Sequence, residues 1–409
     1  MASLALSGFL FAIFTVASDV ILPLWVTGDL GMSAGDWANL RSLRFAGVTA
    51  GVVLLGALSD RFGLRLMGFL CMVALAAVSA MIALGSPALL VVIMPVFGAL
   101  VSTVYVNSNT MTQLVSTLRQ GLANSIYRAS SAAAAIVAPV LATTLAGVMG
   151  GYQAVFLVLA VVVAVTAVVL LAYPNSDEPK PLRSVGQELK GLGRMYLIAA
   201  RQGQLMAFIN ISLIWGCMVA GIGIYAAIYF TKDLNLTDRQ FGWLFSCGAA
   251  LTLGLTILAG FVLDRLSLRT VHVVSAIVIS ASLVVMGLTN NLYINMAMLL
   301  ISIPLTNVLV GPSSMWVSRC AGAGTQASAF SVQKVLGALY VTVFTAFWGL
   351  MESWMSIQTI FLLGGLAGLV SAMGFLFLKD PPRLERSPQA HMQVQRELAE
   401  ATVTQTPPD

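Results

Sequence analysis

Hydrophobic stretches of roughly 20 residues, separated by short polar connections, follow one another along almost the whole chain. A helix needs about 20 apolar residues to cross a bilayer, whereas a strand of a membrane barrel alternates apolar and polar positions over about 10 residues. The stretches do not alternate, so the pattern predicts spanning helices. We expect twelve spans, at 4–27, 37–58, 65–84, 88–111, 122–147, 152–172, 205–230, 239–262, 270–289, 292–317, 326–350 and 355–378.

The composition supports this interpretation. Hydrophobic residues make up 58% of the chain and charged residues only 9%, whereas about a quarter of the residues of a soluble domain are charged. In lipid, each backbone polar group must be bonded within its own segment, and uninterrupted apolar runs can do so only as helices. We therefore expect an all-α, multi-pass protein of the inner or plasma membrane, with the lipid bilayer as its surroundings.

One connection is much longer than the others. Residues 173–204 carry prolines, lysines and arginines and lie midway, so we expect a linker between one six-helix bundle at 1–172 and a second at 205–378. The tail at 379–409 is polar and is expected to be disordered. Most of the 21 Lys and Arg residues lie in connections on one side, which by the positive-inside bias places the linker and both termini in the cytoplasm.

A short charged turn occurs twice. The first elbow, residues 56–65, reads Gly56-Ala-Leu-Ser-Asp60-Arg61-Phe62-Gly63-Leu64-Arg65, and the second elbow, residues 260–269, reads Gly260-Phe-Val-Leu-Asp264-Arg265-Leu266-Ser267-Leu268-Arg269. The displacement is 204 residues, half the chain. At the same offset, Ser33-x-x-Asp36 aligns with Thr237-x-x-Gln240, and both patterns predict helix starts capped by a side chain. The chain is therefore expected to hold two similar halves.

The first elbow resembles the signature loop between helices 2 and 3 of the major facilitator superfamily of secondary transporters, and the second resembles its loop between helices 8 and 9. The resemblance covers residues 1–378. It implies twelve helices in two pseudo-symmetric six-helix bundles that work by alternating access. It also implies that the elbows form a conformational gate locking the bundles together at the cytoplasmic side, with Gly56, Asp60, Arg61, Gly63, Arg65, Asp264, Arg265 and Arg269 as its residues.

The residue types of the elbows also support predictions that do not depend on the resemblance. Gly63 is expected to permit a tight turn, because glycine adopts conformations closed to other residues. For Arg65 and Arg269, an equally good hypothesis is that they only mark the topology. Topology does not need the carboxylates of Asp60 and Asp264, which favours the gate for them.

Ionisable residues inside a span are costly and are candidates for the transport pathway. Asp19 lies about nine residues from one end of its helix, or roughly 13 Å deep. Arg44 lies at a comparable depth in the next span, with Arg41 one turn nearer the surface. The antiparallel helices could therefore place Asp19 against Arg44 in an ion pair. Two hypotheses stay open: a pair linked to protons or substrate, and a structural bridge.

Arg128 and Lys334 form a second candidate set. The repeat offset takes Arg128 to Val332, within two residues of Lys334, so each half offers a cation at a similar depth. Since transporters of this kind bind substrate between their repeats, the two cations would suit an anionic group. Alternatively, both side chains extend to the cytoplasmic interface. By resemblance, helices 1, 4, 7 and 10 line the cavity, which adds Asn107, Tyr225 and Asn307 as candidate ligands.

Several classes of protein find no support. The chain has no Walker loop, no His-Glu-x-x-His and no Gly-x-Ser-x-Gly, and its four cysteines lack metal or redox spacing. We expect no enzyme activity, no cofactor, no metal and no nucleic-acid partner. The leading hypothesis is a monomeric secondary active transporter, a symporter or antiporter, that moves a small organic anion with proton coupling. The second is a proton-driven exporter of drug-like amphipathic compounds. The resemblance weakens it, because many drug exporters of the superfamily carry an arginine in helix 4 and this chain has none around 93–96. A transporter-like sensor is the third.

Overall fold

The computed structural model describes residues 2–114, 120–172, 211, 221–265, 267–321 and 326–378. The helices of the first half are α1 (Ala2–Gly28), α2 (Ala34–Phe62), α3 (Leu64–Ile82), α4 (Pro87–Leu114), α5 (Gln120–Met149) and α6 (Tyr152–Leu171). Those of the second half are η1 (Gly221–Tyr225), α9 (Ala226–Ile228), η2 (Tyr229–Asp233), α10 (Asp238–Arg265), α11 (Leu268–Leu288), α12 (Leu292–Ala321), α13 (Gln326–Met351) and α14 (Ile357–Phe375).

These bounds confirm the all-helical prediction over the described residues, where no strand occurs. Eleven of the expected spans each coincide with one helix. The expected span at 205–230 lies largely outside the described residues, and its described end is formed by η1, α9 and η2, in which two π-helical turns flank one α-helical turn. Within the described ranges, seven helices are long and apolar enough to cross a membrane.

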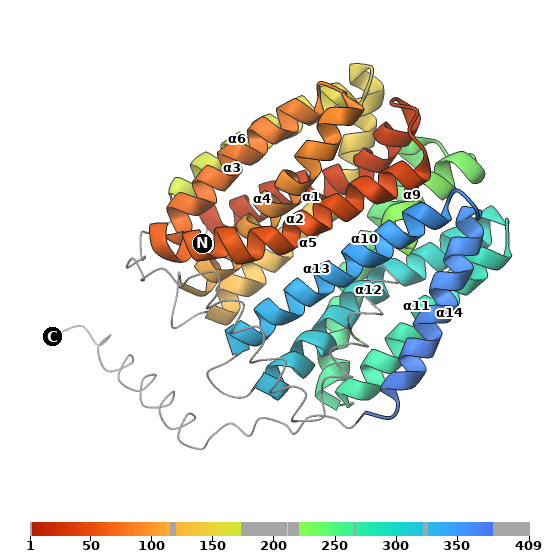
Figure 1. Cartoon of the computed structure of the whole chain (residues 1–409). Helices are drawn as coiled ribbons and strands as arrows, with labels where there is room; N and C mark the ends of the chain where they lie inside the picture. The colour runs from red at the N-terminus through yellow and green to blue at the C-terminus, as the bar shows by residue number, and fades with distance from the viewer. Residues whose placement is uncertain are drawn as a thin grey trace.

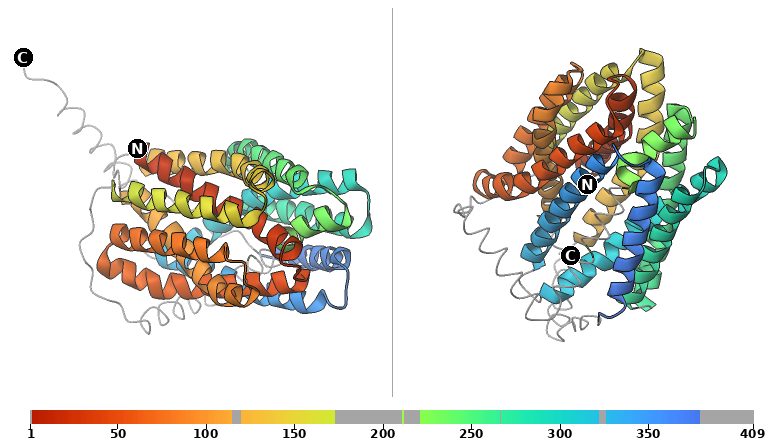
Figure 2. Two further views of the ribbon diagram at one scale, coloured as in Figure 1. Left: turned by 90° about the horizontal axis from the view of Figure 1, so that it is seen from above. Right: turned by 45° about the vertical axis from the view of Figure 1, so that its right-hand side comes forward.

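The helices form two bundles that lie against each other (Figure 1). In the first, α1 packs on α5 and α6, α2 on α4, and α3 on α4 and α6; in the second, α11 packs on α12 and α14, and α10 on α12. The bundles meet where α2 packs on α13 and α5 packs on α10. Figure 2 shows the helices of both bundles running alongside one another from two further directions. The expected linker at 173–204 and the tail at 379–409 lie outside the described residues, so the bundle boundaries stay predictions.

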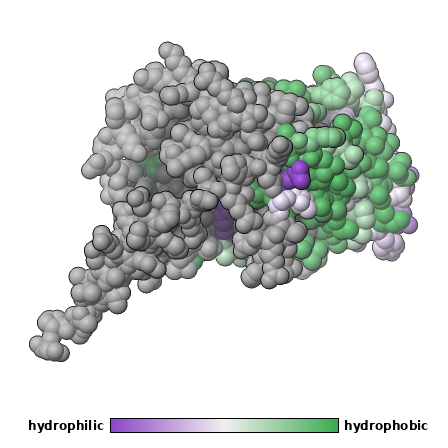
Figure 3. Space-filling model, turned by 90° about the horizontal axis from the view of Figure 1, so that it is seen from below, coloured by the Kyte–Doolittle hydropathy of each residue, from purple (hydrophilic) through white to green (hydrophobic). Residues whose placement is uncertain are grey.

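The connections between the helices gather at two opposite ends of the molecule. The elbow end carries the turn between α2 and α3, and the distal end carries the connection at 29–33 between α1 and α2, at opposite ends of the red and orange helices in Figure 1. The predicted topology places the elbow end in the cytoplasm. Most of the described face in Figure 3 is hydrophobic, as expected for a surface that faces lipid. The chain is an integral multi-pass membrane protein.

The helix boundaries follow from local chemistry that the sequence predicted. At the start of α2, the Ser33 hydroxyl accepts from the backbone N–H of Asp36 at 3.0 Å, and the Asp36 carboxylate accepts from the backbone N–H of Ser33 at 3.0 Å. Thr237 and Gln240 make the same reciprocal pair before α10, at 3.3 and 2.9 Å. Gly63 separates α2 from α3 with φ of +90°, a conformation that favours glycine. Both predicted caps and the predicted tight turn are confirmed.

Glycines bring the backbone of α2 directly against α4. A methyl group on Gly47 would lie 1.9 Å from the carbonyl oxygen of Pro95, and one on Gly51 would lie 2.5 Å from the Cα of Ala99. From the other side, a methyl group on Gly98 would lie 1.9 Å from the carbonyl oxygen of Arg44. Small residues are common where membrane helices meet, because they allow the two backbones to approach this closely. It fixes the position of the helix that carries Arg41 and Arg44.

Candidate functional site

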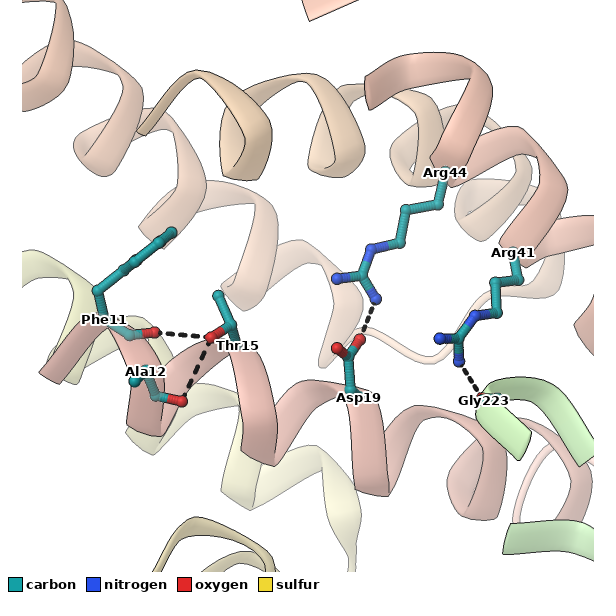
Figure 4. A network of polar contacts seen from close by, with 7 residues as sticks. All are labelled: Phe11, Ala12, Thr15, Asp19, Arg41, Arg44 and Gly223. Atoms are coloured by element: carbon teal, nitrogen blue, oxygen red, sulfur yellow. Dashed lines mark hydrogen bonds and ion pairs between the residues drawn. The ribbon is translucent and has the colours of Figure 1, made fainter. Parts of the chain in front are cut away.

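An ion pair joins Asp19 of α1 to Arg44 of α2 within the first bundle. The guanidinium of Arg44 donates to a carboxylate oxygen of Asp19, and Figure 4 shows the two side chains pointing toward each other from facing helices. The pairing that depth counting allowed is therefore present.

The two partners differ in their access to water. The Arg44 side chain is 10% exposed and the Asp19 side chain 42% exposed. Arg44 is held between its ion pair and the ring of Phe97, 4.6 Å from its centroid. Ser18 and Val20, the chain neighbours of Asp19, are buried. An ionised carboxylate at this depth requires water or a partner, and Asp19 has Arg44 as its partner while part of its side chain stays exposed.

Arg41 is the residue that sequence reasoning placed near the pair but gave no role. It lies one helical turn before Arg44 and donates to the carbonyl oxygen of Gly223 in η1, on the other bundle (Figure 4). The residue is 7% exposed, with the rings of Trp37 and Phe45 at 5.9 and 5.7 Å. The sequence contained a signal that Arg41 belongs to the same site: it lies three residues before Arg44, which puts both side chains on one face of α2.

The cluster of Asp19, Arg41 and Arg44 carries one more positive than negative charge. Neither α4 nor α6 contains an acidic or basic residue, and α5 contains only Arg128. Asp19 is also the only ionisable side chain of α1. Helices α1, α4, α5 and α6 therefore supply no second carboxylate, and the cluster suits an additional anionic group better than a cationic one.

Arg128, one of the two cations of the second predicted set, lies away from this cluster. Arg128 is exposed on α5, beside Tyr127 and Ser130, which pack against Gly8. Along α1, Gly8 lies about 16 Å from Asp19, at 1.5 Å per residue. The side chains of Lys334 and Asn307 lie outside the described residues, so their part in an anion site stays a prediction.

Asn107 and Tyr225 occupy different environments. The buried amide of Asn107 donates to the Ser59 hydroxyl at 3.0 Å and so joins α4 to α2. This contact gives Asn107 a packing function near the elbow end. Tyr225 is fully buried in η1, and its hydroxyl has no partner among the described residues. Of the two candidates, only Tyr225 belongs to the segment that Arg41 contacts.

The gate is only partly described. The side chains of Asp60, Arg61, Asp264 and Arg265 and the surroundings of Gly56 lie outside the described residues, and Arg65 is half-buried. Arg269 donates to the carbonyl oxygens of Leu376 and Leu378 at 3.3 and 3.1 Å, which fastens the start of α11 to the chain end of α14. Arg269 thus has a structural contact within the second bundle, and the locking role of the elbows stays a prediction.

His272, near the start of α11, is buried and stacks on Phe375 with ring centroids 4.2 Å apart. The second ring neighbour of Phe375 is Trp316, at 4.8 Å. Depth along the helix does not determine which side the residue faces, and His272 faces α14.

At the distal end, the two bundles are in close contact. The backbone N–H of Gly35 donates to the Glu352 carboxylate at 3.2 Å, and a methyl group on Gly35 would lie 2.7 Å from the carbonyl oxygen of Gly349. Deeper along α2, the Ser42 hydroxyl donates to the carbonyl oxygen of Thr342 at 2.9 Å. The α5–α10 contact is equally tight, since a methyl group on Gly242 would lie 2.5 Å from the Thr143 hydroxyl. The distal end is therefore closed.

A hydrogen bond between the bundles adds to this closure. The Tyr152 hydroxyl, at the start of α6, donates to the carboxylate of Asp238, at the start of α10. Burial raises the pKa of the nearby Asp29 carboxyl; the hydrogen bond from the Tyr152 backbone opposes this shift, and the charge of Asp238 adds to it. Lys232 donates to the carbonyl oxygen of Thr27 at 2.5 Å, which is a further link between the bundles.

Comparison with known proteins agrees with the arrangement. A family model described as Major Facilitator Superfamily matches residues 4–345. Among curated proteins, none matches the chain closely enough to count as a relative.

Solved structures of similar shape are transporters of low sequence identity. The nucleoside transporter NupG has a TM-score of 0.73 at 13% identity, over 92% of this chain and 98% of its own. A POT family transporter in complex with 5-aminolevulinic acid has a TM-score of 0.75 at 13% identity, over 92% and 95%. A peptide transporter POT in complex with sulfate has 0.74 at 15%, over 91% and 93%. At these identities the likeness shows the fold alone.

Proposed function

The chain belongs to the major facilitator superfamily and is a secondary transporter of that type, and from this premise we propose that it moves a small organic anion together with protons. The observation that carries the proposal is the ion pair at the centre of the first bundle, in which Asp19 is 42% exposed while Arg44 is 10% exposed. A proton can reach the carboxylate, and α1, α4 and α6 offer the guanidinium no acidic partner besides Asp19.

The pair allows a proton and an anion to substitute for each other. When Asp19 takes up a proton, it loses its negative charge and Arg44 loses its ionic partner. A carboxylate or similar group of the substrate then binds Arg44 in its place, in the bidentate geometry that arginine favours. When the substrate leaves, Asp19 releases its proton and binds Arg44 again. Proton and anion therefore travel together.

The second hypothesis, proton-driven export of drug-like amphipathic compounds, makes a different demand. Such a site needs an accessible apolar surface with a carboxylate for a lipophilic cation. In this cluster the single carboxylate is already paired with Arg44, and Arg41 adds a further positive charge. The charge balance favours the anion.

Uptake by proteoliposomes tests the proposal. A panel of small monocarboxylates is compared with a dipeptide, a nucleoside and a lipophilic cation, with and without an inward proton gradient. We expect at least one carboxylate to accumulate in response to the gradient, and Asp19→Asn to abolish the response. Asp36→Asn is the matched control, because Asp36 is a carboxylate of the exposed cap of α2. Gradient-driven movement of the cation or the nucleoside alone would contradict the proposal, as would a fully active Asp19→Asn protein.

A further inference from the structure

Arg41 connects the central ion pair to the contact between the bundles. Arg44 binds Asp19 of α1, whereas Arg41, one turn away, binds the carbonyl oxygen of Gly223 in η1 (Figure 4). The repeat offset of 204 residues takes Asp19 to Gly223. The two arginines of α2 therefore bind equivalent positions of the first and seventh helices, one on each bundle.

The burial of Arg41 makes its charge sensitive to its neighbours. Arg41 is 7% exposed, and the Nε of its guanidinium has no hydrogen-bond partner among the described residues. Removing such a charge from water costs several kcal/mol unless other charges compensate it. One backbone carbonyl compensates only part of this cost. Among the described residues, the negative charge of Asp19 stabilises the charged form of Arg41, and the positive charge of Arg44 opposes it.

The contact with Gly223 is part of the closed distal end. Ser42, the next residue, donates to Thr342 of α13, and Gly35 lies against Gly349 two turns earlier. The acceptor lies in a π-helical turn, a rare form that is frequent at functional sites. If α2 separates from α13 and η1 at this end, the contact between Arg41 and Gly223 must break as well.

We propose that Arg41 is a positioning residue that makes closure of the distal end depend on the charge balance of the cluster; this rests on the proposed proton-coupled anion transport. One negative charge faces the two guanidinium groups in two cases: when Asp19 is ionised and the site is empty, and when Asp19 is protonated and an anion occupies Arg44. In both cases the distal end closes. When Asp19 is protonated and no anion is bound, the two positive charges repel each other and Arg41 leaves Gly223. Closure then occurs with both proton and anion or with neither, which is the coupling rule of a symporter.

Asp19 is the carboxylate that contacts this cluster in the part of the chain that the structure describes. Among the elements that pack on α1, α4, α6 and α9 contain no acidic or basic residue, α5 contains Arg128 only, and α2 carries Asp36 in its exposed first turn and Asp60 near its other end. On the side of α13, Lys334 lies within the helix and Glu352 just after its end, where it binds Gly35. The remaining titratable groups of these helices and η1 are tyrosines, neutral at physiological pH: Tyr105, Tyr127, Tyr152, Tyr225 and Tyr340.

Two double variants of equal net charge test the role of Arg41. The reporter is Ser42→Cys in a protein whose own cysteines are replaced, because Ser42 is buried against α13 in the closed state. The measured quantity is the rate of maleimide labelling of the purified, reconstituted protein without substrate. Asp19→Asn imitates the protonated, empty site and is expected to label at least threefold faster than the parent.

The two double variants separate the effect of the cluster's net charge from the effect of the contact between Arg41 and Gly223. Asp19→Asn with Arg44→Gln restores the original charge of the cluster and keeps Arg41, so labelling is expected to return to the parent rate. Asp19→Asn with Arg41→Gln has the same charge but lacks the contact with Gly223, so labelling is expected to stay fast. Equal rates in the two doubles, or no change in Asp19→Asn alone, would overturn the proposal.

Two further arms keep the outcome interpretable. A matched set of variants without the reporter retains Cys71, which is buried in the first bundle and must stay unlabelled in a folded protein. Where a variant fails this control, Asp19→Ser or Arg41→Met takes its place. In the parent at low pH, a transported monocarboxylate is expected to slow the labelling. If the doubles differ as expected but no anion slows the labelling, the proposed substrate class is wrong while the link between Arg41 and closure stands.

Discussion

The helices α2 and α10 hold the same place in the two halves of the chain, yet their middle parts differ. Each begins with a side chain that caps the helix, at Ser33 and at Thr237, and each leads into an elbow. In α2 the middle carries Arg41 and Arg44. At an offset of 204 residues, the corresponding positions of α10 are Phe245 and Gly248.

These substitutions change what the helix does. Phe245 packs beside Phe241 with ring centroids 6.1 Å apart, and a methyl group on Gly248 would lie 2.8 Å from Ile303 of α12. The middle of α10 is therefore a packing surface. The middle of α2 binds a carboxylate on one bundle and a carbonyl on the other. The repeat supplies two similar frames for movement, while the charged chemistry is present in one of them.

Removal of the charge from α2 should have the largest effect on transport. We expect Arg44→Gln to lower proton-driven uptake at least tenfold, because Asp19 then has no partner to exchange for an anion. Breaking a fully buried ion pair costs about 3–5 kcal/mol, and the loss in thermal stability should be smaller here because Asp19 reaches water. Phe245→Leu, at the α10 position equivalent to Arg41, is the control and should keep uptake within about twofold. Equal losses in both variants would contradict the asymmetry.

A methyl group added to a glycine in the contact between α2 and α4 should destabilise the protein more than one added to a glycine of α10 that faces open space. Gly47→Ala forces a methyl group against the Pro95 carbonyl and should destabilise the protein by about 3 kcal/mol. Gly254 has no atom within 4 Å of an added methyl group, so Gly254→Ala should be neutral or should stabilise by up to about 1 kcal/mol. Thermal unfolding of the purified proteins measures both. A Gly47→Ala protein as stable as its parent would show that α2 can move away from α4 at little cost.

The elbows allow the two halves to be compared at the other end. We expect Asp60→Asn to shift the protein toward the state open at the elbow end by about 1 kcal/mol, or roughly fivefold, because the predicted lock is weakened. Asp264→Asn should have a smaller effect, since the second elbow matches the family pattern less well. Cysteine labelling at both mouths of the cavity measures the shift. An unchanged pattern in Asp60→Asn would leave the elbow charges as topology markers only.

The caps should show the smallest difference between the halves. Ser33→Ala and Thr237→Ala should each destabilise the protein by about 1 kcal/mol, because each removes the acceptor of one backbone N–H. Ser33→Asn, which keeps an acceptor at the cap, should restore most of the loss. A cost at one site several times that at the other would mean that the halves differ at their helix starts as well.

Much of the frame was predictable because it depends on local patterns. Apolar runs of the length of a bilayer define the spans, and the reciprocal caps at Ser33 and Thr237 and the turn at Gly63 each involve residues close together in the chain. The pair of Asp19 and Arg44 could also be predicted, because a short connection makes α1 and α2 antiparallel and depth can then be counted from their ends. The repeat offset identified the halves without any alignment.

The tertiary structure alone decided how the bundles meet. The acceptor of Arg41 is a backbone carbonyl 182 residues away, in a π-helical turn that no side-chain pattern marks. The rotation of α11 that buries His272 against Phe375, and the approach of Gly35 to Gly349, likewise depend on packing between helices distant in the chain. The sequence by itself determined the spans, the repeat and the charges available inside them, because these are properties of single segments. The partner of each charge across the bundle interface follows from helix rotation and closure, which many weak contacts determine together.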